Sequence, residues 1–95
     1  MKLKLFLISQ DTNLEFDTYA CAVVAAEDEA SAKKFHPCGY MVWSSLHKGW
    51  VFSDNRKKYE DDSWVVLKNV KCKYLGEASE GIQAGVICAG FNAAG

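Results

Sequence analysis

The middle of the chain carries aromatic residues that could bind a ligand by stacking. Tyr40, Trp43 and Trp50 lie near glycines and polar residues rather than inside strand-like runs. A ring outside the core can stack on a nucleobase, at ~1–3 kcal/mol for each base, or fill a pocket of a partner protein. Arg56, the one arginine, follows closely and could neutralise a phosphate. These four residues are candidates for ligand binding.

The end of the chain adds a further aromatic residue and an amide. Phe91 could stack on the same ligand while Asn92 hydrogen-bonds to its polar edge, because a side-chain amide has both donors and an acceptor. Every residue of this set also has a structural alternative. The loop aromatics could fill the core, and Phe91 could end a strand before a turn at Asn92. Trp64, which precedes two valines, is expected in the core.

Residue types for catalysis or metal binding occur without the spacing that either chemistry needs. Cys38 could pair with His36 or His47. However, a cysteine and a histidine that lie two residues apart on an irregular turn, as His36 and Cys38 do, rarely have the geometry of a nucleophile and its base. The chain has no C-x-x-C pair, and a tetrahedral metal site needs four convergent donors. Asp61 and Asp62 are adjacent, so on an extended chain they point to opposite faces. We therefore expect no enzyme activity, no metal and no cofactor.

Length and charge narrow the class of partner. The 95 residues carry 11 basic and 12 acidic side chains, for a formal net charge of −1. Duplex nucleic acid is bound through a basic footprint, which this balance does not provide. All cations except Arg56 are lysines, which lack the bidentate fork of arginine. We expect a single domain over residues 1–95 that binds no duplex nucleic acid.

The N-terminus resembles a secretory signal only superficially. Its apolar run covers residues 5–8, against about 7–15 residues in a signal core. No stretch reaches the ~20 apolar residues of a membrane span, so no membrane partner is expected. The expected compartment is a cytoplasm, where thiols stay reduced. Two disulfides are the alternative for a secreted chain with these four cysteines: Cys21, Cys38, Cys72 and Cys88.

Hydrophobic patterning predicts a small sheet with helical cover. Strand-like patterns occupy residues 2–9, 18–26, 64–75 and 86–91. The run 18–26 is apolar almost throughout, which predicts a central strand covered on both faces. Asp28 is a suitable N-cap for a short helix that ends at His36-Pro37, because the residue before a proline avoids the helical region.

The rest of the chain is less regular. Residues 10–17 read as a loop, and Gly76 is expected to begin a turn. The segment 38–63 gives no clear elements apart from a charged loop or hairpin tip at 54–62. Together these patterns predict an α+β domain: a mostly antiparallel sheet of about four to six strands with one or two short helices on one side.

Three stretches of the chain resemble a family of small proteins encoded by bacteriophages and prophages. They read LFLISQ near the start, DTYACAVVAAEDEASAKKFHP, and VKCKYLGEASEGIQAGVICAGFNAAG at the end. The resemblance covers half to two-thirds of the chain, and the segment 38–63 has no counterpart. This chain departs from the pattern at Ala20-Cys21, at Phe35 and at Gly90. None of the shared stretches is a catalytic motif.

The resemblance implies a phage accessory protein that acts in the cytoplasm of the host bacterium. The chain is similar in this respect to the Thoeris anti-defence proteins, oligomeric sponges that capture cyclic ADP-ribose-type or cyclic oligonucleotide signals without degrading them. No ligand residue of that class maps onto a position of this chain. We therefore expect sequestration of a small nucleotide signal by a homodimer or higher homo-oligomer. The alternatives are an anti-CRISPR-like inhibitor of a host defence protein and a structural phage protein without a soluble ligand.

Overall fold

The structure is a computed structural model that describes residues 2–12, 18–58 and 63–92. Its elements, in chain order, are β1 (Lys4–Ser9), β2 (Thr18–Ala26), α1 (Glu29–Lys33), β3 (Met41–Ser44), β4 (Gly49–Phe52), the 3-10 turn η1 (Leu67–Asn69), β5 (Lys71–Glu77) and β6 (Gly85–Asn92). Four strands form an antiparallel sheet in the order β5-β1-β2-β6, and β3 and β4 form a separate hairpin. The predicted α+β class is confirmed.

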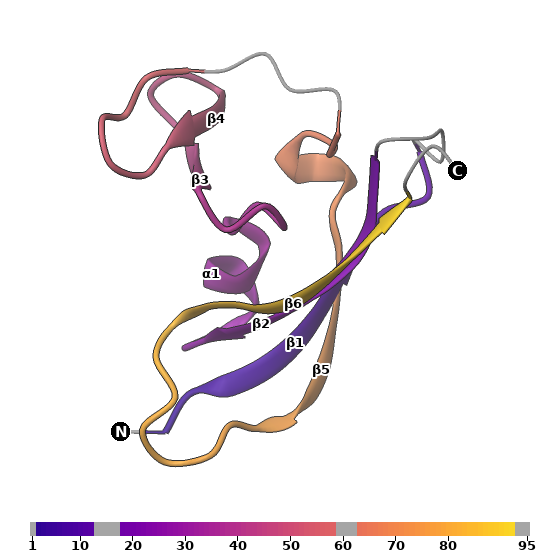
Figure 1. The fold of residues 1–95 in the computed structure, drawn as a ribbon, viewed down its shortest axis with the longest axis vertical. Coiled ribbons are helices and arrows are strands. Elements are labelled where there is room, and N and C mark those ends of the chain that lie inside the picture. Colours follow the sequence, from indigo (N-terminus) through magenta and orange to yellow (C-terminus); the bar gives the residue numbers. More distant parts are fainter. Residues whose placement is uncertain (1, 13–17, 59–62, 93–95) are drawn as a thin grey trace.

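The helix and the hairpin lie on the same side of the four-stranded sheet (Figure 1). Side chains that alternate along β1 and β2 point to that side, where Phe6, Ile8 and Val24 are buried in the main apolar cluster. β2 is a central strand, as predicted. Its other face is less covered than predicted, because Cys21 and Val23 remain half-buried there.

The helix begins where the sequence predicted. Asp28 is the N-cap, and its Oδ1 accepts a hydrogen bond of 2.8 Å from the backbone N–H of Ser31. Glu29 and Lys33 are 3.6 Å apart across one turn. The helix ends at the C-cap Lys34, before His36-Pro37, and Phe35 packs against the core as an isolated bridge partner of β3.

The structure differs from the predicted elements at two places. Residues 64–75 are not one strand: Trp64 and Val65 are buried in an extended segment, η1 follows, and β5 begins at Lys71. Gly76 does not begin a turn but lies within β5 at φ +143°, where the pairing with β1 shifts. A backbone that must bend at a bulge favours glycine because it has no Cβ. The predicted loop at 10–17 and charged tip at 54–62 extend beyond the described residues.

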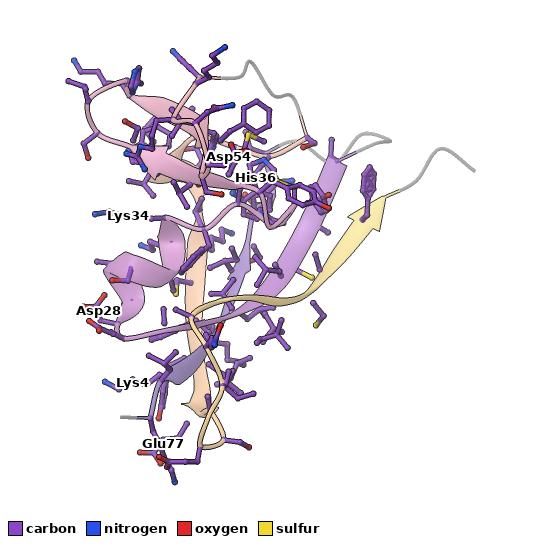
Figure 2. All side chains as sticks on the ribbon, turned by 60° about the vertical axis from the view of Figure 1, so that its left-hand side comes forward. Lys4, Asp28, Lys34, His36, Asp54 and Glu77 are labelled. Atoms are coloured by element: carbon purple, nitrogen blue, oxygen red, sulfur yellow. The ribbon has the colours of Figure 1, made fainter. Side chains whose placement is uncertain are left out.

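A fully buried histidine joins the sheet to the hairpin. His36 is 0% exposed, and its ring contacts the rings of Tyr19, Trp50 and Trp64 at centroid distances of 5.8, 5.3 and 6.3 Å. Its Nδ1 accepts a 3.0 Å hydrogen bond from the backbone N–H of Cys38, so Nδ1 carries no proton. Figure 2 shows His36 where the hairpin meets one end of the sheet.

We predict that the Asp28 cap makes a pH-dependent contribution to stability. Its hydrogen bonds with Ser31 hold the pKa of the Asp28 carboxyl below its ordinary value of 3.8. A lowered folded-state pKa means that the stabilisation is complete above the unfolded-state pKa and is lost as the pH falls below 3.8. In urea titrations, Asp28→Ala should be less stable than the wild type at neutral pH, with the gap narrowing in acid.

The neutral cap Asp28→Asn is the matched control. Asparagine also accepts a hydrogen bond at the N-cap but has no carboxyl group to protonate, so Asp28→Asn should keep its advantage over Asp28→Ala at every pH. A wild-type advantage over Asp28→Ala that persists unchanged in acid would contradict the assignment.

Candidate functional site

A groove between the β3–β4 hairpin and the η1 turn is the best candidate for a binding site. Its volume is about 610 Å³, and it is lined by Trp43, Lys48, Val66, Leu67 and Lys68. This size is within the range of small-molecule sites in proteins. The lining comes from two segments that are distant in sequence, so the groove exists only in the folded chain.

One hydrogen bond connects the two walls of this groove. The indole Nε1 of Trp50, on β4, donates to the backbone oxygen of Val65 at 2.9 Å. Val65 directly precedes the groove residues Val66 and Leu67, so this bond ties their segment to the hairpin. Trp50 is 5% exposed, and a hydrogen bond at such a buried position is protected from water.

Trp43 is held in the groove from two sides. Its ring contacts that of Trp50 edge to face, with centroids 5.3 Å apart. Its backbone N–H donates to the oxygen of Lys34 at 2.9 Å, which fixes β3 beside the end of α1. The Trp43 side chain is half-buried, so part of the ring remains available to a ligand. A ring held in place loses little conformational freedom when a ligand binds to it.

The described residues that line the groove carry positive charge. Lys48 lies in the hairpin turn at φ +52°, and Lys68 lies in η1; both side chains are exposed. None of the described residues that line the groove is acidic. An aromatic wall, an aliphatic floor and two ammonium groups suit a ligand with an aromatic ring and a negative charge.

A second hollow, of about 670 Å³, shares Leu67 and Lys68 with the groove. It extends along α1 and adds the side chains of Lys33 and Lys34, together with Asp28 and Glu29. Figure 2 shows Lys34 at the end of α1 nearer the hairpin and Asp28 at the opposite end. The positive charge of the groove therefore continues onto the near end of the helix.

The sequence-predicted residues do not all meet at this groove. Trp43 lines it, whereas Trp50 belongs to the core and supports it from behind. Tyr40 precedes β3 and is 72% exposed, and Arg56 is exposed beyond β4 at φ +60°; neither lines the groove.

Phe91 and Asn92 lie on another part of the molecule, at the end of the edge strand β6. The Phe91 ring is 46% exposed and packs against that of Tyr19 at 4.7 Å, and Asn92 pairs with Thr18 in the sheet. Tyr19, His36 and Trp50 stand between the Phe91 ring and that of Trp43 in a series of contacting rings. Within a single chain, Phe91 and the loop aromatics therefore do not line one pocket. The sequence predicts that they converge across a dimer, and that convergence stays a prediction.

Sequence analysis missed Lys48 and Lys68. Gly49 indicated a nearby turn, but the positive φ of that turn belongs to Lys48, and Gly49 itself begins β4. Nothing local distinguished Lys68 from the other lysines, because its position depends on the contact between Trp50 and Val65.

Of the residues considered for catalysis, Asp61 and Asp62 lie outside the described residues, and the others make local hydrogen bonds. The backbone N–H of Cys38 donates a hydrogen bond to Nδ1 of His36, and the Cys38 Sγ accepts one from the backbone N–H of Tyr40 at 3.3 Å. His47 Nδ1 lies 3.0 Å from the hydroxyl oxygen of Ser44, which is buried and also accepts the His47 backbone N–H. Among residues 2–12, 18–58 and 63–92 no cluster of three or more His, Cys, Asp or Glu side chains could hold a metal ion.

The four cysteines, all of which lie in the described segments, form no disulfide with one another. Burial raises the pKa of the Cys72 thiol above its ordinary value of 9.0, which makes it a poor nucleophile at neutral pH. None of the helices described here has the length and apolar character needed to cross a membrane.

Comparison of the chain with protein-family models, with curated proteins and with solved structures found no match. The geometry and charge of the groove are therefore the basis for the functional argument.

We predict that Trp50→Phe destabilises the protein by about 1–3 kcal/mol, the cost of leaving a buried carbonyl without its donor. Trp43→Phe is the matched control, because it removes the same atoms from a half-buried ring whose indole donates no hydrogen bond to Val65. Chemical denaturation measures both effects. Equal losses in the two variants would contradict the role assigned to the Trp50 hydrogen bond.

Proposed function

We propose that the protein binds a small nucleotide in the groove and sequesters it without chemical change. The observation that carries this proposal is the position of Trp43 beside Lys48 and Lys68, in a groove whose described lining residues include no acidic side chain. A base would stack on the exposed part of the Trp43 ring. The two ammonium groups would neutralise phosphates, and Lys34 would extend the positive surface for a second phosphate.

Sequestration rather than turnover fits the chemistry of the lining residues. Trp43, Lys48, Val66, Leu67 and Lys68 include no carboxylate, imidazole, thiol or hydroxyl group. These groups are the most common general bases and nucleophiles in enzymes. A lysine amine can take either role when it is desolvated, whereas Lys48 and Lys68 are exposed. Together with the resemblance to phage proteins, this favours capture of a nucleotide immune signal of the cyclic ADP-ribose or cyclic oligonucleotide type in the host cytoplasm.

A protein–protein inhibitor is the second candidate, and the hairpin supplies a specific observation for it. Leu46 in the turn of the hairpin is 87% exposed, and Tyr40 at its base is 72% exposed. Exposed large apolar side chains at a projecting turn can act as anchors in a pocket of a partner. This candidate predicts that Leu46→Ala abolishes inhibition of a host defence protein without affecting nucleotide binding.

The proposal is tested by capture of nucleotides from a defined panel. The protein is mixed with cyclic dinucleotides, cyclic trinucleotides and cyclic ADP-ribose isomers, filtered, heated, and the released ligand identified by mass spectrometry. Intact ligand released on heating supports sequestration. Release of a modified ligand would establish an enzyme, and retention of none would leave the protein–protein inhibitor as the better candidate.

Substitutions in the groove then locate the site. Trp43→Ala should weaken binding of the captured nucleotide by about 5-fold to 150-fold, since one base stack contributes ~1–3 kcal/mol. Lys48→Ala and Lys68→Ala should each weaken binding and reduce its salt dependence. Lys57→Ala is the control for charge, because Lys57 is exposed beyond β4 and does not line the groove. Isothermal titration calorimetry measures all four, and wild-type affinity of Trp43→Ala would refute the groove as the site.

A further inference from the structure

The two edges of the four-stranded sheet differ in charge. β5 forms one edge and carries Lys71, Lys73 and Glu77. β6 forms the other edge, and its eight residues, GVICAGFN, include no charged residue and no proline. Charges and prolines are the usual means by which an edge strand is kept from pairing with another chain. β5 has this protection and β6 does not.

The outer side of β6 also has the shape and chemistry of a pairing surface. No strand in the described part of the chain pairs with it, so its outward N–H and C=O groups are available to a further strand. Ala89 and Gly90 are small, so they add no bulky side chain to either face of a sheet that continues past this edge. Two larger apolar side chains flank them: Ile87 is 50% exposed and Phe91 is 46% exposed.

We propose that two copies of the chain associate through β6, antiparallel about a twofold axis, to form one continuous sheet of eight strands. A twofold axis makes the same surface serve both partners, which is the commonest arrangement of soluble homodimers. The absence of charge along β6 removes the repulsion that identical charged edges would suffer. The proposal is independent of nucleotide binding, because no residue of β6 lines the groove.

The residues of β6 also define a register. Directly opposed residues of an antiparallel pair share the same orientation of their backbone N–H groups, so the axis must pass through a residue and not between two. Counted along β6, an axis at Ala89 brings the bulge residue Ile87 to the level of the partner's Phe91, and Phe91 to the level of the partner's Ile87. An aromatic and a β-branched side chain that meet across two strands make a favourable contact. An axis at Cys88 or at Gly90 would not bring Ile87 of one copy together with Phe91 of the other.

The other edge provides a matched control. Ile87 is the extra residue of a bulge, since Val86 pairs with Val24 and Cys88 with Val23. Leu75 is the equivalent extra residue on β5, between Tyr74 and Gly76, and is 48% exposed. A lysine at either position is therefore placed on an exposed bulge of an edge strand, with a similar local cost.

The test is the mass in solution of the full chain and its variants, measured by light scattering from low to high micromolar concentration. The wild type and Leu75→Lys should have twice the chain mass of 10.5 kDa, and Ile87→Lys should have the monomer mass. A monomeric wild type would overturn the proposal, as would a dimer that survives Ile87→Lys but not Leu75→Lys. A far-UV circular dichroism spectrum like that of the wild type establishes that Ile87→Lys is folded.

Oxidative cross-linking tests the register. Opposed Cα atoms in an antiparallel pair are about 4.5–5.5 Å apart, within the range that a disulfide spans. Ala89→Cys in a Cys88→Ser background should therefore form a covalent dimer. A covalent dimer of the wild type through Cys88 would place the axis at Cys88 and overturn this register. Nucleotide capture by Ile87→Lys at the wild-type level keeps this test separate from that of the groove.

Discussion

The burial of one imidazole ring determines how the two parts of this molecule fit together. His36 follows the helix at a proline, and its side chain has no contact with solvent. A polar ring in such a position is tolerated only when it is hydrogen-bonded, and the backbone N–H of Cys38 meets that need at Nδ1. The same turn lets the His36 N–H donate to the oxygen of Met41 at 3.2 Å, where β3 begins. The direction of the hairpin relative to the sheet follows from this turn.

The groove is a consequence of that arrangement. The edge of the His36 ring meets Trp50, Trp50 meets Trp43 and hydrogen-bonds to Val65, and these contacts place the hairpin against the segment that leads into η1. Core residues therefore determine where Trp43 and the lysines of the proposed site lie. In such a small domain the same few rings form the core and support the groove.

Local patterns predicted the parts of the fold that depend on local energetics. The alternation in β1, the apolar run of β2 and the cap at Asp28 each have a signal within a few residues. The hairpin was missed because its strands are only four residues each and its aromatic residues read equally well as loop or core. Trp43 and Trp50 show most clearly what local patterns cannot predict. They are the same residue type on paired strands, and what distinguishes the buried Trp50 is its hydrogen bond to the carbonyl of Val65, 15 residues away along the chain.

The three tryptophans have three different surroundings, which makes the protein its own optical reporter. Trp64 is 4% exposed, and its Nε1 has no hydrogen-bond partner among the described residues. Trp50 is equally buried but donates to a carbonyl, and Trp43 is half-exposed in the groove. Because indole emission shifts with polarity, the three fluorophores differ in colour and in access to quenchers. A ligand that covers Trp43 would keep an added quencher away from that ring, while the emission of the buried Trp50 and Trp64 stays constant. Reduced quenching of Trp43 would then report occupation of the groove without any label.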